Sequence, residues 1–228
     1  MALIINIETS TKTCSVCIAK NGELIDLIEI KGEKYMHSEK LHVLIQNILT
    51  ENQLSLDQVD AIGVCKGPGS FTGLRIGVSA AKGMAYALKK PLVSCYTNDL
   101  MMENYSITNS SNKVLYLTMI DARREEVYIG GYNFQKTRVN PITAQVINKE
   151  YVNEILLYNN EVVFLGEGAR KFKAKFKNKN LLVHDQDLTS ASGMVKLTYE
   201  KYMTKSFEDI AYFNPFYLKD FQPHKKNN

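Results

Sequence analysis

The segment from Lys66 to Arg75 has the composition of a ligand-binding loop. It reads Lys-Gly-Pro-Gly-Ser-Phe-Thr-Gly-Leu-Arg, and an apolar repeat behind it predicts a helix to about Leu88. Amides and the dipole at a helix N-terminus can hold an anion. The glycine spacing matches neither the P-loop nor the dinucleotide-binding pattern, and Pro68 stands where a nucleophile elbow needs glycine, so those three classes of site are excluded. The candidate residues that this segment would contribute to a ligand-binding cleft are Gly67, Gly69, Ser70, Thr72 and Arg75.

A polar turn near the N-terminus is a second candidate site. Glu8, Thr9 and Ser10 follow an apolar strand, and a carboxylate with hydroxyls at a strand-turn-strand tip can hold hydrated magnesium and a phosphate. Asp121 ends a later apolar strand, and Arg123 lies beside it. An ordinary polar hairpin turn at residues 8–11 is the alternative, and the residues alone favour it.

The histidines and cysteines predict no metal site and no disulfide. The sequence has four histidines, His37, His42, His184 and His224. His37 and His42 are five residues apart, about 140° around a helix, whereas a shared metal needs a spacing of four. Cys14 and Cys17 lie three apart in an alternating strand and therefore face opposite sides. With four cysteines and no basic leader, the chain is expected to be a reduced, cytoplasmic protein without a membrane segment.

Two helical faces are candidates for an association surface. Gly73, Gly77 and Ala81 recur at four-residue spacing and form a flat face against which another backbone can pack closely. An earlier helix presents an apolar face whose partner-interface candidates are Leu41, Leu44, Ile45 and Ile48. The spacing does not decide whether the partner lies in this chain or in another.

A run of cations near the C-terminus could contact RNA phosphates. Its members are Arg170, Lys171, Lys173, Lys175, Lys177 and Lys179, with Phe172 and Phe176 interleaved. The favoured alternative is the solvated edge of a helix whose phenylalanines face the core. The net charge of +4 does not by itself indicate nucleic-acid binding.

The elements that must position these residues recur in two halves. In the first half, three strands, a helix, a strand ending in the glycine segment and a second helix follow one another. Val114–Ile120, Glu126–Tyr132, Ile142–Ile147 and Glu161–Leu165 predict strands in the same order in the second half. The 228 residues, 45% of them hydrophobic, suffice for two lobes, which we place at residues 1–103 and 104–228. Unrelated mixed α/β segments are the alternative.

Several stretches resemble, in order, the signatures of the TsaB family. They are residues 4–11 (Ile-Ile-Asn-Ile-Glu-Thr-Ser-Thr), 37–39 (His-Ser-Glu), 67–77 (Gly-Pro-Gly-Ser-Phe-Thr-Gly-Leu-Arg-Ile-Gly), 121–128 (Asp-Ala-Arg-Arg-Glu-Glu-Val-Tyr) and 215–218 (Pro-Phe-Tyr-Leu). They span nearly the whole chain, and the glycine-proline-glycine segment is the most specific. Lys219 stands where the family usually has arginine, and Glu8 where it usually has aspartate.

The resemblance implies a duplicated, two-lobed α/β fold of the actin, sugar-kinase and chaperone-ATPase type. It also implies a dimerisation subunit without catalytic or metal-binding residues of its own and without a cofactor, with residual nucleotide binding left open. The implied partners are the catalytic paralogue TsaD and the ATPase TsaE, with tRNA reached through the complex and a homodimer when the chain is alone. The alternatives are an ATPase or small-molecule kinase of the same fold, in which Glu8 and Asp121 hold magnesium, and a peptidase, as the glycoprotease name of the wider family suggests.

Overall fold

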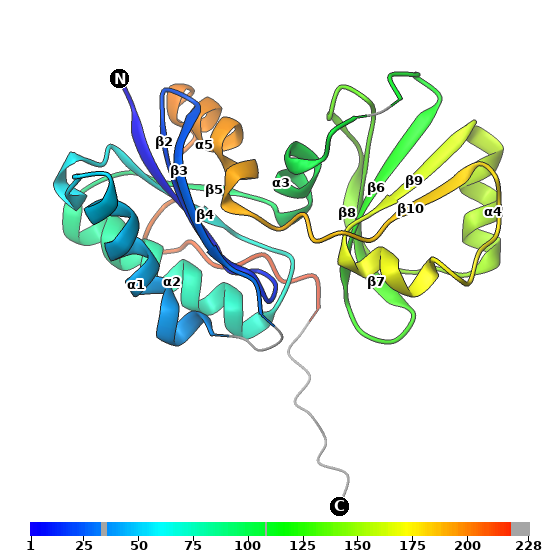
Figure 1. Cartoon of the computed structure of the whole chain (residues 1–228), viewed down its shortest axis with the longest axis horizontal. Coiled ribbons are helices and arrows are strands. Elements are labelled where there is room, and N and C mark those ends of the chain that lie inside the picture. The colour runs from blue at the N-terminus through cyan, green and yellow to red at the C-terminus, as the bar shows by residue number, and fades with distance from the viewer. Residues whose placement is uncertain (33–35, 108, 220–228) are drawn as a thin grey trace, which may run out of the picture.

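Two five-stranded sheets, each with helices packed against it, build the molecule (Figure 1). The structure is a computed structural model that describes residues 1–32, 36–107 and 109–219. The first sheet contains β1 (Leu3–Glu8), β2 (Cys14–Lys20), β3 (Glu23–Ile30), β4 (Ala61–Cys65) and β5 (Leu92–Cys95). Its strand order is β3-β2-β1-β4-β5, with antiparallel pairing in the meander and parallel pairing from β1 to β5.

The second sheet repeats the topology of the first. It contains β6 (Val114–Asp121), β7 (Glu126–Tyr132), β8 (Arg138–Val146), β9 (Glu161–Leu165) and β10 (Leu181–His184). Its order, β10-β9-β6-β7-β8, is that of the first sheet when each strand is replaced by its equivalent. The predicted duplicated, two-lobed fold is confirmed. Strand β8 begins earlier than predicted and includes Pro141, which is tolerated because β8 is an edge strand.

Helices cover the two sheets unequally. In the first lobe α1 (His37–Glu51) and α2 (Phe71–Leu88) cover one face, and the short η1 (Leu56–Gln58) precedes β4. In the second lobe α4 (Lys149–Tyr158) is the equivalent of α1. After β9 the chain forms only the 3₁₀ helix η2 (Glu167–Phe172), so the predicted second glycine turn opens a short helix and not a counterpart of α2.

The chain crosses between the lobes more than once. Helix α3 (Thr97–Asn104) leads from the first sheet to the second, and the apolar core around it contains residues of both lobes. After β10, η3 (Ala191–Gly193) and α5 (Met194–Met203) pack on the first sheet, where α5 covers the face opposite α1 and α2 (Figure 1). The predicted assignment of all residues from 104 to 228 to the second lobe is therefore wrong for this part of the chain.

A C-terminal strap, defined here as residues 205–219, continues from α5 along the first lobe. The amide of Phe216 donates to the carbonyl oxygen of Lys66 at 2.7 Å, just before the glycine segment. At its end, Lys219 forms an ion pair with Glu126 at the start of β7. The strap thus joins the glycine segment of the first lobe to the second lobe.

The predicted placement of Cys14 and Cys17 on opposite faces of the sheet is confirmed. Cys14 lies in the core beneath α1 and α2, and Cys17 lies in the core on the other face of the sheet. Alternation along β2 separates them, and burial raises the pKa of the Cys14 thiol to about 11 and that of Cys17 to about 12. Neither thiol is a reactive group at neutral pH.

Candidate functional site

The turn after β1 is packed against the start of α2. Thr9 Oγ1 donates to the carbonyl oxygen of Gly73 at 2.8 Å, and the amide of Ser70 donates to the carbonyl oxygen of Ser10 at 2.6 Å. Ser70 also caps α2, because its hydroxyl accepts from the amide of Gly73. The Thr9 hydroxyl and the Ser70 amide, two donors that a phosphate could contact in an open turn, are thus already bonded within the protein.

Glu8 is fully buried beneath this turn. Its Oε1 accepts from the amide of Ser10 at 2.6 Å and from the hydroxyl of the same residue. Burial raises the pKa of the Glu8 carboxyl, although hydrogen bonds from Cys65 and Ser10 oppose the shift. A carboxyl with no exposed surface cannot coordinate a magnesium ion in a solvent-filled cleft, so Glu8 is a structural residue in this arrangement.

Glycine is required where the turn and α2 touch. A Cβ on Gly69 would lie closer than 3.0 Å to the carbonyl oxygen of Ser10, and one on Gly73 would lie equally close to that of Thr9. Gly67 has a φ of +105°, in the region that favours glycine. The glycine segment therefore permits close backbone approach between the turn and the helix, in place of the anion-binding loop that its composition suggested.

The equivalent turn of the second lobe, between β6 and β7, is exposed and strained. Arg123 and Arg124 have φ values of +74° and +50°, which non-glycine residues rarely adopt. Asp121 Oδ1 accepts from the amide of Arg123 at 2.6 Å. Lys171 Nζ donates to Asp121 Oδ1 at 2.8 Å and to the carbonyl oxygens of Arg124 and Glu126 at 2.7 and 2.8 Å. Sequence reasoning placed Lys171 only in a basic run and missed that it fixes this turn.

A cavity of about 550 Å³ is lined by residues of both turns. Its lining residues are Lys12, Asp121, Arg123, Glu167, Arg170 and Lys171. Burial raises the pKa of Glu167, and the nearby carboxylates of Asp187 and Asp121 add to the shift. Of the predicted cleft residues, Asp121 and Arg123 reach this cavity. Glu8, Thr9 and Ser10 lie together but are buried, and Thr72 and Arg75 are exposed on α2.

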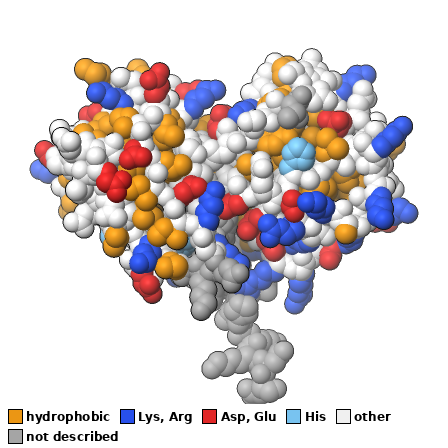
Figure 2. All heavy atoms as spheres, in the orientation of Figure 1, with side chains coloured by type: hydrophobic (Ala, Val, Ile, Leu, Met, Phe, Trp, Pro, Cys, Tyr) orange, Lys and Arg blue, Asp and Glu red, His pale blue; other side chains and the backbone are white. Residues whose placement is uncertain are grey.

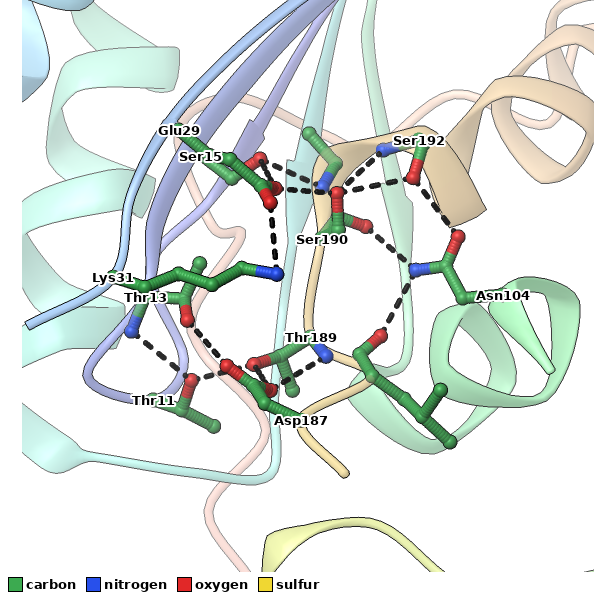
Figure 3. A network of polar contacts seen from close by, with 12 residues as sticks. Thr11, Thr13, Ser15, Glu29, Lys31, Asn104, Asp187, Thr189, Ser190 and Ser192 are labelled. Carbon is green, nitrogen blue, oxygen red and sulfur yellow. Dashed lines mark hydrogen bonds and ion pairs between the residues drawn. The ribbon is translucent and has the colours of Figure 1, made fainter.

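Hydroxyl groups hold the connector from β10 to η3 against the first lobe (Figure 3). Thr11 and Thr189 join their Oγ1 atoms at 2.7 Å, and Thr13 Oγ1 donates to Asp187 Oδ2 at 2.6 Å. These contacts bridge residues more than 170 positions apart in sequence. They fix the connector beside the turn after β1, on the first-lobe side of the interlobe region.

Glu29 extends this network. It accepts from Ser190 Oγ at 2.7 Å and from Ser15 Oγ at 3.2 Å, and it pairs with Lys31 at 2.9 Å (Figure 3). Burial alone would raise the pKa of Glu29, but the hydrogen bonds from Lys31 and Ser190 hold it below its ordinary value. The connector is thus attached to β2 and β3 as well as to the turn.

The predicted association residues lie inside the first lobe, so that prediction is wrong. The seven residues, all buried, are Leu41, Leu44, Ile45, Ile48, Gly73, Gly77 and Ala81. The α1 residues and Ala81 form the core above the first sheet, and Gly77 packs against Thr9. Periodicity correctly identified the residues that share a face, but that face covers the lobe's own sheet and turn.

A neighbouring stripe of α2 remains on the surface. Ile76, Ala80, Met84 and Leu88 recur every four residues and are only partly buried. With α1 and η1 they line a shallow apolar groove of about 500 Å³, whose other lining residues are His42, Leu56, Ser79, Gly83 and Ala87. The four-residue spacing of this stripe is visible in the sequence, just as the spacing of Gly73, Gly77 and Ala81 is.

The basic run is mostly paired with carboxylates. Lys173 Nζ lies 3.0 Å from Asp185 Oδ1, and Lys175 pairs with Glu125. Phe172 is fully buried, as the core-facing alternative predicted. The helix η2 ends at Phe172, so the rest of the basic run is not helical. Figure 2 shows charges of both signs interspersed on one face of the molecule.

The histidines His37 and His184 have different hydrogen-bond partners. His37 is buried, with Nε2 2.7 Å from the carbonyl oxygen of Thr11, and burial lowers its pKa. His184 on β10 contacts the hydroxyl of Tyr105 at 3.1 Å. His224 lies outside the described residues. Within residues 1–32, 36–107 and 109–219, no three His, Cys, Asp or Glu side chains are grouped as metal ligands.

Comparison with known proteins gives consistent matches. A family model described as TsaD, tRNA N6-adenosine threonylcarbamoyltransferase, matches residues 34–222. The tRNA threonylcarbamoyladenosine biosynthesis protein TsaB of Haemophilus influenzae is 29% identical over 233 residues, which cover 98% of this chain and 96% of that protein. The protein of the same name from Escherichia coli is 28% identical over 228 residues, which cover 98% and 97%. The resemblance to TsaB inferred from the motifs is confirmed.

Among solved structures, YeaZ from Pseudomonas aeruginosa has the same fold. It matches with a TM-score of 0.77 at 23% identity, covering 96% of this chain and 100% of that chain. None of the helices formed by the described residues has the length and apolarity needed to cross a bilayer.

Proposed function

Because this chain belongs to the TsaD family of tRNA N6-adenosine threonylcarbamoyltransferases and its full-length relatives are TsaB proteins, we propose that it is a non-catalytic subunit of that modification system. In this role it pairs in the cytoplasm with a catalytic TsaD paralogue, with TsaE as the accessory ATPase. The complex transfers threonylcarbamoyl to N6 of adenosine 37 in tRNA, and the chain contacts tRNA through that complex.

The packing of the turn after β1 is the observation that carries the proposal. In a catalytic subunit with a metal or phosphate at this turn, a carboxylate and amides would have to face the cleft. Here Glu8 is buried and bonded to Ser10, and the start of α2 lies against Thr9 and Ser10. The arrangement supports a subunit that has retained the fold while its first-lobe turn serves packing.

We place the pairing surface on the exposed apolar stripe of α2. Ile76, Ala80 and Met84 project from the first lobe beside α1, and small residues between them allow a partner helix to approach closely. An apolar groove of this kind suits a partner helix with an apolar face. The same stripe would support a homodimer when the chain is alone.

A matched pair of variants at Gly83 tests this placement. A Cβ at Gly83 meets no atom within 4 Å, so both Gly83→Ala and Gly83→Arg should fold. Gly83→Arg places a long cation in the groove and should weaken binding to TsaD at least about tenfold, whereas Gly83→Ala should bind like the wild type. Equal affinity of both variants for TsaD, measured by calorimetry, would remove the pairing surface from this groove.

Reconstitution tests the non-catalytic role. The isolated chain should transfer no threonylcarbamoyl and hydrolyse ATP negligibly, and adding TsaD, TsaE and the adenylate-forming enzyme should give tRNA modification. Robust magnesium-dependent ATP turnover by the isolated chain, abolished by Asp121→Ala, would instead support an ATPase or small-molecule kinase of the same fold.

A further inference from the structure

His42 lies on the wall of the apolar groove beside the exposed stripe of α2. Its side chain is exposed on α1, which lies next to α2 on the first lobe (Figure 1). The other residues that line the groove are apolar, are glycine or, at Ser79, carry a neutral hydroxyl. Among the described residues that line the groove, His42 is therefore the single one that can carry a charge.

The other ionisable side chains of the three surrounding elements do not belong to the groove lining. They are His37, Glu39, Lys40 and Glu51 on α1, Arg75, Lys82 and Tyr86 on α2, and Asp57 on η1. Lys82 Nζ donates to the carbonyl oxygen of Phe213 at 2.8 Å, and the guanidinium of Arg75 lies 4.0 Å from the centroid of the Phe71 ring. No carboxylate among the described lining residues can therefore balance a charge on His42.

A helix seated on the stripe would remove His42 from water. Ala80, Gly83 and Ala87 are small and let such a helix approach closely. A neutral imidazole can be buried there, whereas an unpaired charge that is buried weakens binding by more than about a hundredfold. Histidine is the side chain whose charge ordinarily changes between about pH 5 and pH 8. The groove thus places a titratable group where a partner would bury it without a counter-ion from this chain.

We propose that His42 makes pairing at this groove dependent on pH, because its neutral form admits the partner helix and its protonated form opposes it. The inference rests on the proposed function, in which the occupant of the groove is the TsaD paralogue. It adds a regulation of that pairing by acidification. The fold of the first lobe need not change, since His42 is already exposed in the free chain.

Calorimetry of the full-length chain with TsaD of the same organism, at pH 8.0 and at pH 5.5, tests the proposal. For each variant the readout is the ratio of the Kd at pH 5.5 to the Kd at pH 8.0. We expect the ratio of the wild type to be at least about fivefold larger than that of His42→Gln, which keeps a polar side chain but cannot titrate. Groups of TsaD that titrate contribute equally to both ratios and cancel in the comparison.

His184→Gln is the matched control, because it removes a histidine outside the groove. His184 lies on β10 of the second lobe, where its Nδ1 is 3.1 Å from the hydroxyl of Tyr105. This variant should keep the ratio of the wild type. Circular dichroism at both pH values checks that each variant is folded.

The opposing results separate this inference from the proposed function. If the wild type and His42→Gln pair with TsaD and have the same ratio, the role of His42 is wrong while the pairing stands. If the wild type has a smaller ratio than His42→Gln, the partner supplies a carboxylate to the protonated ring, which also overturns the proposal. If TsaD binds none of the variants at pH 8.0, the proposed function fails and the regulation fails with it.

Discussion

Because α2 contacts the turn after β1 at Gly73 but not at Gly83, glycine to alanine should have opposite effects on stability at these two positions. Gly73 and Gly83 lie ten residues apart in the same helix. A Cβ at Gly73 would come well inside 3.0 Å of the Thr9 carbonyl oxygen, a backbone atom, whereas a Cβ at Gly83 meets nothing within 4 Å. Glycine to alanine should therefore destabilise the protein at Gly73 and stabilise it at Gly83.

The magnitudes follow from two opposing terms. Replacing glycine by alanine inside a helix stabilises by about 0.5–1 kcal/mol, and this term applies at both positions. At Gly73 the added methyl group must also push the turn away from α2, which costs about 1–3 kcal/mol for an overpacked site. We expect Gly83→Ala to gain about 0.5–1 kcal/mol and Gly73→Ala to lose about 1–2 kcal/mol net.

Thermal unfolding of the isolated chain measures both effects. At about 2–4 °C per kcal/mol for a chain of this size, the Tm of Gly83→Ala should rise by about 1–4 °C and that of Gly73→Ala should fall by about 2–8 °C. A shift of the urea midpoint with an unchanged m-value would show that the substitution changes stability and does not change the compactness of the unfolded state. If Gly73→Ala is as stable as Gly83→Ala, the turn does not lie against α2 and the packing of the Glu8 site is wrong.

Two further predictions concern Glu8 and Lys171. Burial raises the pKa of Glu8 above its ordinary value of 4.5, so the stability linked to this proton is fully present below about pH 4.5 and is lost as pH rises through the folded-state pKa. Glu8→Gln should therefore gain in Tm relative to the wild type as the pH is raised above about 4.5, and a pH-independent difference would contradict a buried carboxyl. Lys171→Met removes three donors from the β6–β7 turn and should cost about 1–2 kcal/mol in urea unfolding. Lys173→Met, which breaks one surface pair with Asp185, should cost much less than Lys171→Met, and equal losses would refute the turn-fixing role.

The order of apolar and polar residues predicted the strands well because turn residues mark where these strands begin and end. Strands β7 and β9 have the predicted limits, and the opposite orientation of Cys14 and Cys17 followed from alternation alone. The recurrence of strand order in the two halves, a property of the whole chain, was also readable. These features depend on neighbouring residues or on repetition, and both are present in a single sequence.

What the sequence could not supply are contacts between distant residues. The bond from Thr9 to Gly73 spans 64 positions, and nothing local to either residue indicates it. The return of α5 to the first sheet and the bonds of Lys171 to the β6–β7 turn are of the same kind. Periodicity shows which residues share a helix face, but it does not show what covers that face. For this reason the predicted association residues of α1 and α2 were taken from faces that are buried within the first lobe.

The two stripes of α2 link the packed turn to the proposed pairing surface. Residues i and i+3 are about 60° apart around a helix, so the outer stripe beginning at Ile76 lies next to the inner stripe beginning at Gly73. Glycine at 73 and 77 lets α2 lie close to Thr9 in the turn that follows Glu8. The same close approach fixes the orientation of α2 and hence the direction in which Ile76 and Met84 project. Under the proposed function, the loss of a first-lobe site and the presentation of a docking face are two consequences of one packing arrangement.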